Sequence, residues 1–174
     1  MLEPDGGNLM SFFDRVAGIF GSDDKPTRSQ KLDEWLEETL KRELKVDSIE
    51  RDDDGDIPIP CGSAVAFVRA YDEEPSRIHI FAPLLGDFAM RPEVYEAVNS
   101  INLQVPLAKA VVETESNQII LAVDLFLFDE LSPDHLMAAI DLIADRADYY
   151  YDSRLQKRFG GKTMLDDDED ELDV

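Results

Sequence analysis

Two histidines, one cysteine and a run of aspartates are the residues that could carry chemistry in this chain. His79 lies within a predicted strand and His135 in the first turn of a predicted helix. Neither histidine stands beside a recognisable acid or nucleophile motif in the sequence. Cys61 lies in Pro-Cys-Gly-Ser, which matches no signature of a catalytic thiol. We therefore predict structural histidines, a structural cysteine and no catalytic residue.

The aspartate run fits the calcium loop of EF-hands only in part. If Gly55 takes the glycine position 6 of such a loop, acidic residues fall at positions 1, 3 and 5, namely Glu50, Asp52 and Asp54. Position 12 is then Cys61, where calcium needs a bidentate carboxylate. The Asp-Gly pair is instead typical of a hairpin turn. No glycine-rich loop opens a helix to hold phosphate, so the sequence predicts neither a metal nor a cofactor.

The charge of the chain limits its partners. Among 174 residues, 17 are lysine or arginine and 39 are aspartate or glutamate, which gives a formal net charge of −22. Nucleic acid and anionic membranes both attract basic proteins, so we expect this protein to bind neither. The longest apolar run, 119–128, is too short to span a bilayer and is interrupted by Asp124. With one cysteine and no basic secretion signal, we expect a cytoplasmic protein.

The elements that must position these residues follow from periodicity. Apolar residues at helical spacing predict helices over 32–44, 91–101 and 132–155, the last capped by Ser132 and ended by Gly160-Gly161. Extended apolar stretches predict strands near 63–71, 77–85, 109–113 and 118–128. Before them, Ile49 leads into the Asp-Gly hairpin, whose return segment is kept short or at an edge by Pro58 and Pro60. Hairpin-length connections favour antiparallel pairing. We predict an α+β fold of about five antiparallel strands with helices packed on the sheet, in the order α-β-β-β-α-β-β-α.

The N-terminal segment carries an apolar stripe of its own, and an amphipathic helix is predicted from residues spaced 0, 3, 4, 7 and 11 apart: Leu9, Phe12, Phe13, Val16 and Phe20. This stripe either completes the core or occupies an apolar groove in the resting protein. We divide the chain into an N-terminal segment and linker (1–27), one domain (28–161) and an acidic tail (162–174) expected to be disordered.

Over residues 28–161 the order of motifs resembles the YbjN family, which is similar in fold to type III secretion chaperones of the CesT class. The resemblance rests on AFVRAY, RIHIFAPLL, VYEAVNSIN, IILAVDLFL and RFGG, taken in order. Actinobacterial relatives with an acidic end look closest. The resemblance implies a small bacterial protein without enzymatic activity, which binds a protein or peptide client and forms a homodimer.

Two hypotheses of function follow. The first is a chaperone-like module that holds a client segment in an apolar groove. Its candidate residues are Phe67, Arg69, Phe81, Asn99, Asn102 and Phe126. The alternative is an acidic regulatory or scaffold protein that captures a basic partner by long-range attraction. For the two asparagines, a tie between a helix end and the next strand is the competing interpretation.

Overall fold

A computed structural model describes residues 30–71, 74–127 and 131–164 of the chain. The predicted N-terminal helix lies outside the described residues, as does the acidic end from residue 165. The helices are α2 (Gln30–Leu44), α3 (Pro92–Gln104), α4 (Pro133–Asp145), the π-helical η1 (Arg146–Tyr151) and α5 (Asp152–Phe159). The strands are β1 (Ile57–Cys61), β2 (Ala64–Tyr71), β3 (Arg77–Gly86), β4 (Lys109–Glu113) and β5 (Gln118–Phe126).

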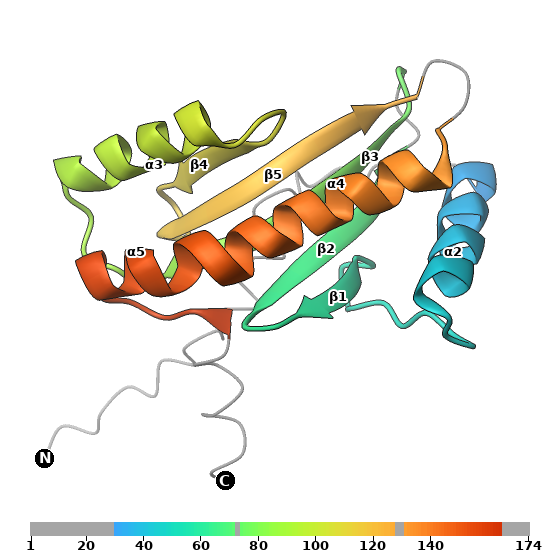
Figure 1. The fold of residues 1–174 in the computed structure, drawn as a ribbon, viewed down its shortest axis with the longest axis horizontal. Helices are drawn as coiled ribbons and strands as arrows, with labels where there is room; N and C mark the ends of the chain where they lie inside the picture. Colours follow the sequence, from blue (N-terminus) through green and yellow to red (C-terminus); the bar gives the residue numbers. More distant parts are fainter. Residues whose placement is uncertain (1–29, 72–73, 128–130, 165–174) are drawn as a thin grey trace, which may run out of the picture.

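The five strands form one antiparallel sheet in the order β1-β2-β3-β5-β4 (Figure 1). The predicted fold class and order of elements are confirmed. β1 lies at an edge, as its two prolines indicate, because proline offers no N–H to a neighbouring strand. The α3 connection takes the chain from β3 past the position of β5, so β4 forms the other edge.

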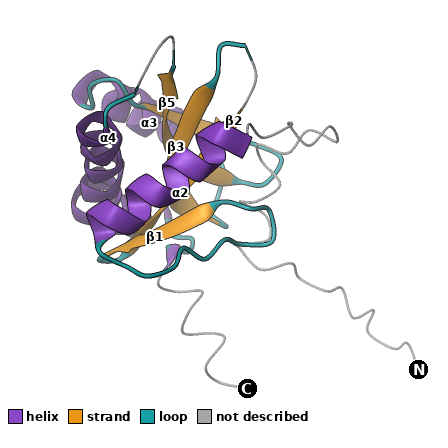
Figure 2. Cartoon of the chain, turned by 90° about the vertical axis from the view of Figure 1, so that its right-hand side faces the viewer, coloured by secondary structure: helices purple, strands orange, loops and turns teal. Residues whose placement is uncertain are grey.

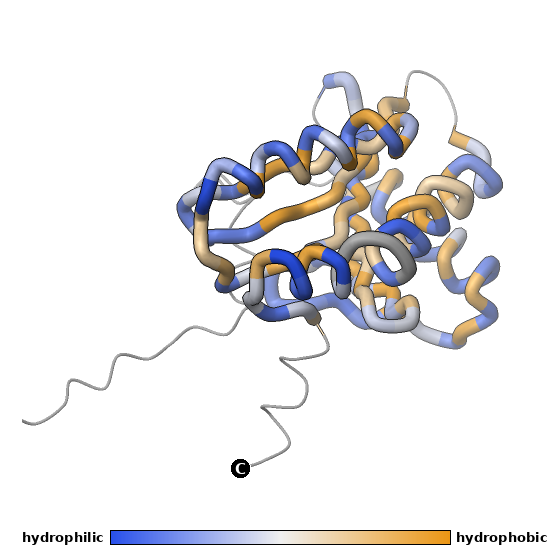
Figure 3. Tube along the Cα trace, turned by 60° about the vertical axis from the view of Figure 1, so that its left-hand side comes forward, coloured by the Kyte–Doolittle hydropathy of each residue, from blue (hydrophilic) through white to orange (hydrophobic). Residues whose placement is uncertain are grey.

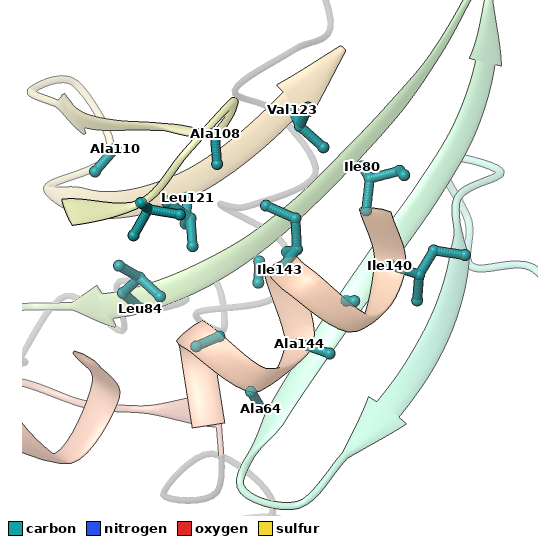
Figure 4. Packing of buried hydrophobic residues seen from close by; sticks show 14 of the residues in the cluster. Ala64, Ile80, Leu84, Ala108, Ala110, Leu121, Val123, Ile140, Ile143 and Ala144 are labelled. Atoms are coloured by element: carbon teal, nitrogen blue, oxygen red, sulfur yellow. The ribbon is translucent and has the colours of Figure 1, made fainter. Parts of the chain in front are cut away.

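The helices α3, α4 and α5 cover one face of the sheet, and α4 runs diagonally across its centre (Figures 1 and 2). Alternate residues of each strand point into this layer, where Ile80 and Leu121 belong to one buried cluster with Ile140 and Ile143 of α4 (Figure 4). Figure 3 shows apolar strands in the interior and mainly hydrophilic turns along the outside of the helices. Alternation of strand residues and the helical stripe together produce the main core.

The chain after α5 crosses from the helical layer towards the opposite face. Gly160 and Gly161 have φ of 70° and 94°, and a Cβ on Gly161 would lie 2.4 Å from the carbonyl oxygen of Gly86. Lys162 then pairs with Gly86 through backbone hydrogen bonds of 2.8 and 2.9 Å. Met164 is only 3% exposed. Residues 162–164, which the sequence placed in the acidic tail, therefore belong to the folded part.

The Asp54-Gly55 pair is a turn but not a hairpin. The Gly55 N–H donates to the carbonyl oxygen of Asp52 at 2.9 Å, and β1 follows without a strand before the turn. Residues 45–51 are mostly polar and lack the alternation of a strand, and Arg51 instead pairs with Asp33 of α2 at 3.2 Å. The hairpin between β1 and β2 is made at Gly62 and the following serine.

That hairpin is held against the π-helical segment. The Ser63 N–H and Oγ both donate to Oδ1 of Asp148 at 2.6 Å, and these bonds lower the pKa of Asp148. Gly62 has φ of 62°, and a Cβ there would lie 2.4 Å from the Asp148 carboxylate oxygens. The turn therefore depends on a glycine for conformation and for space.

We predict that Gly62→Ala destabilises the fold more than Gly160→Ala does. Both positions have positive φ, so alanine should lower the free energy of unfolding by about 1–2 kcal/mol at each. Gly160 has no atom within 4 Å of the added Cβ, whereas Gly62 meets Asp148, which should add about 1–3 kcal/mol. Urea denaturation of both variants measures the difference, and equal losses would contradict the contact.

Candidate functional site

The candidate site lies on the second face of the sheet, which we define as the side pointing away from α3, α4 and α5. A small buried cluster occupies its centre and consists of Phe67, Phe81, Ile120, Ala122 and Met164. Phe67 and Phe81 are direct partners in the register of β2 and β3, and their rings stack with centroids 5.1 Å apart. The cluster therefore gathers aromatic and aliphatic side chains from three strands and from the segment after α5.

A row of charged groups crosses the same face next to this cluster. At one side, Arg69 donates two side-chain hydrogen bonds to the carboxylate of Asp56, from Nε to Oδ1 and from Nη2 to Oδ2, the latter at 2.5 Å. Nη2 also donates to the carbonyl oxygen of Asp54 at 3.1 Å. Burial raises the pKa of Asp56, and the hydrogen bonds from Arg69 oppose that rise. This pair joins the turn before β1 to the centre of β2.

The other half of the row is centred on Asp124 of β5. His79 Nδ1 lies 2.8 Å from Asp124 Oδ1, while Arg77 and Lys109 each approach the carboxylate to 3.4 Å. The hydrogen bond with His79, together with the charge of Lys109, lowers the pKa of Asp124 to about 2. A carboxylate held by three partners is a weak base, so this histidine–aspartate pair has the properties of a structural contact.

The structure brings four of the six predicted site residues onto the second face. Phe67, Arg69 and Phe81 lie near its centre, and Phe126 lies at its end, opposite Arg77 in the register. Phe126 is 51% exposed, so its side chain reaches the surface at this end of the face. The other two, Asn99 and Asn102, lie on α3 in the helical layer and do not join this group.

Asn102 ties α3 to the edge strand β4. Its Nδ2 donates to the carbonyl oxygen of Ala110 at 3.0 Å, and its Oδ1 accepts from the N–H of the same residue at 2.6 Å. One amide thus satisfies both backbone groups of Ala110, as a neighbouring strand would. The helix-to-strand interpretation is correct for Asn102, whereas Asn99 is exposed on α3.

Both edges of the sheet are therefore poorly suited to accept an added strand. Pro58 and Pro60 remove two N–H groups from the five residues of β1. At the other edge, Asn102 already occupies the backbone of Ala110 in β4.

The remaining candidate groups lie apart from this face. His135 is exposed in the first turn of α4, where its backbone N–H donates to Oγ of the Ser132 cap at 3.2 Å. Burial, together with nearby acids of α4 and η1, raises the pKa of the Cys61 thiol. Asp52 Oδ1 accepts from the N–H of Asp56 at 2.7 Å, so it stabilises its own turn. Within the described ranges, no group of three potential ligands is placed to hold a metal ion.

Sequence reasoning missed the pairing of His79 with Asp124. The two residues are 45 positions apart, and only the register of β3 with β5 places them opposite each other. Both lie in segments predicted as strands, so alternation could have placed each on a face but not opposite the other.

Among the described helices, none has the length and apolar character needed to cross a membrane.

Comparison with known proteins gives one matching family and solved structures of similar fold. Residues 30–167 match the family model described as T3SS (YopN, CesT) and YbjN peptide-binding chaperone 1. The structure is similar to one from the crystal structure of the ExsC-ExsE complex, with a TM-score of 0.53 and 15% identity over 69% of this chain and 90% of that chain. It is also similar to one from the HopA1-SchA chaperone-effector complex, with a TM-score of 0.52 and 13% identity over 66% and 88%. A comparison with curated protein sequences found no match.

We predict that Asn102→Ala lowers the free energy of unfolding by about 1–3 kcal/mol, because it removes two hydrogen bonds and opens the edge of β4. The variant should also self-associate more readily, since an unpaired edge invites pairing. Asn99→Ala is the matched control on the same helix and should change stability by less than about 0.5 kcal/mol. Urea denaturation and light scattering measure the two effects, and equal behaviour of the variants would contradict the edge contact.

We predict that Asp124→Asn lowers the free energy of unfolding by about 1 kcal/mol at pH 7, after allowance for solvent screening. Since the folded pKa lies below the ordinary value of 3.8, the carboxylate contributes stability above that pH which is lost as the pH falls towards 2. The difference between wild type and variant should therefore shrink between pH 4 and pH 2. Urea titrations across this range test it, with the exposed Asp53→Asn as control. A constant difference would contradict the low pKa.

Proposed function

The chain belongs to the T3SS (YopN, CesT) and YbjN peptide-binding chaperone 1 family, as the order of its motifs indicated, and we propose that it binds an apolar segment of a client protein on the second face of its sheet. One of the structures of similar fold is of a chaperone with its effector, which supports a protein client. The observation that carries the proposal is the cluster of Phe67, Phe81 and Ile120 on a face that α3, α4 and α5 do not cover.

The second face combines apolar side chains with charged ones, which suits a client segment that carries both kinds of residue. Its centre offers aromatic rings to apolar side chains, and its charged row keeps Arg77 and Lys109 on one side. Phe126 is half exposed, next to Arg77 and within reach of an incoming chain. Because the edges carry Pro58, Pro60 and the Asn102 contact, the client is held through side chains more than through added backbone pairing.

Binding of this kind needs no catalysis, metal or cofactor. The family and the fold neighbours point to a binding protein without enzymatic activity. The paired state of Asp124 and the raised pKa of Cys61 agree with that assignment, since neither group is prepared to act as a base or nucleophile. A cytoplasmic location and the division at residues 27 and 161 stay predictions, with the folded part extended to Met164.

The predicted homodimer also stays a proposal, for which the exposed side of α3 is the best surface. Tyr95, Asn99 and Leu103 follow one another at spacing 4, so they lie on one side of this helix. Leu103 is 81% exposed, and Leu107 in the following loop is more exposed still. A second copy of the chain would cover apolar surface here without occupying the second face.

The alternative function rests on the net charge of −22, which would attract a basic partner over long range. Salt separates the two hypotheses. Contacts made through apolar side chains survive high ionic strength, whereas capture by exposed charges is screened.

The test selects peptides from a phage-displayed library of random 15-residue sequences against the full chain. We predict apolar peptides whose dissociation constant rises at least about 10-fold in Phe126→Asp, a loss of about 1.4 kcal/mol. Met90→Asp places the same charge at a 40% exposed position just before α3, outside both proposed surfaces, and should leave binding unchanged. Between 0.05 and 0.5 M salt, the constant should change less than about 3-fold. Selection of basic peptides that are released by salt would favour charge capture instead.

A further inference from the structure

The second face is buried more deeply than the described residues explain. Phe81 is 2% exposed, and the side chains of Ile120 and Ala122 are buried to a similar degree. Within the described part of the chain, Met164 is the one apolar side chain from outside the sheet that joins their cluster. One methionine cannot cover aromatic and aliphatic groups from three adjacent strands, so a further apolar segment is needed to exclude water.

The chain outside the described residues offers one segment of suitable composition. Residues 165–174 are mostly acidic, and the two internal gaps span only two and three residues. Residues 9–20 carry only two charged side chains, Asp14 and Arg15. Their stripe supplies three aromatic and two aliphatic groups: Leu9, Phe12, Phe13, Val16 and Phe20.

α2 packs with the helical layer through Leu36 and Leu40, and a chain of contacts links its first turn to the second face. Asp33, in the first turn of α2, pairs with Arg51 at 3.2 Å. Arg51 donates to the carbonyl oxygen of Gly55 at 3.2 Å. The carbonyl oxygen of the preceding residue, Asp54, accepts from Arg69 on the second face. The residues between Phe20 and Gln30 can extend over about 33–36 Å. The linker is therefore long enough to bring the stripe onto the sheet.

The length of such a helix also matches the width of the sheet. A helix of twelve residues is about 18 Å long. Five strands spaced about 4.8 Å apart extend about 19 Å from the first to the last. A helix formed by residues 9–20 could therefore cross the whole sheet, with its stripe over the cluster of Phe67 and Phe81.

We propose that residues 9–20 occupy the second face in the resting protein and leave it when a client binds. This inference rests on the proposed function and adds regulation to it. A segment tethered by about ten residues acts at an effective concentration of the order of millimolar. A client must therefore bind more tightly than the tethered segment does, and weakly apolar chains are rejected.

A fluorescent reporter in the full chain tests occupancy. Trp35 is the single tryptophan, so Phe12→Trp in a Trp35→Phe background reports on the segment alone. We expect blue-shifted emission and low quenching by acrylamide. Val65→Asp, which introduces a charge beside the cluster, should raise quenching about 3-fold or more, while Met90→Asp, at an exposed position before α3, should not. Emission typical of exposed tryptophan, or an unchanged signal in Val65→Asp, would overturn the proposal.

A second measurement tests whether the segment is removable. A labelled peptide with the sequence of residues 7–22 should bind the full-length Phe12→Ser/Phe13→Ser variant at least about 10-fold more tightly than wild type, with a thermal midpoint near that of wild type. The same peptide with serine at positions 12, 13 and 16 is the control. A collapsed thermal midpoint would show a permanent part of the core and overturn the proposal, as would equal binding to both proteins.

The phage-selected peptides separate this inference from the proposed function. If they bind wild type and the Phe12→Ser/Phe13→Ser variant equally, the function stands and the regulation by residues 9–20 is wrong. If no selected peptide binds either protein, the proposed function itself fails. Tighter binding to the variant supports both.

Discussion

The register of β2, β3 and β5 is the constraint on which the rest of the structure depends. It places Phe67, Phe81 and Ala122 in one line across the sheet and Arg69, His79 and Asp124 in the next. Side chains alternate between faces, so a slip of one residue would exchange the contents of the two layers. The charged line itself opposes such a slip, because the buried groups Arg69 and His79 would lose their partners among the helices.

Residue size distinguishes the two faces. On the helical side, β2 presents small or β-branched residues, including Ala64, Ala66 and Val68, and α4 packs on this strand. Figure 4 shows Ala64 beside α4. On the second face, the same strand presents Phe67 and Arg69, which extend away from the sheet. The small residues allow close packing of one layer, while the large ones create a surface that side chains from another segment can interdigitate with.

The sequence predicted most of the fold because its signals were local. Proline content identified β1 as an edge, the Ser132 cap began α4, and Gly160-Gly161 ended α5. The errors involve information that distant residues supply. Asp54-Gly55 is a turn without a preceding strand because Arg51 is drawn to α2, and residues 162–164 fold because Gly86 offers them a backbone partner. For the candidate site, alternation along β2 could place Phe67 and Arg69 on the same face of the sheet. Only the register of β3 with β5 shows that Asp124 lies beside them.

Because both sheet edges are poorly suited to backbone pairing, a protein of this kind would distinguish its clients mainly by their side chains. Pairing along a sheet edge uses backbone groups that every chain possesses, so it selects weakly by sequence. Here Pro58, Pro60 and the Asn102 amide reduce that mode at both edges. Recognition on the second face would instead depend on side chains that fit around Phe67 and Phe81 and that tolerate the charged line beside them. A client would then be chosen by its pattern of apolar residues, and residues 9–20, which carry such a pattern within the same chain, would set the affinity that it must exceed.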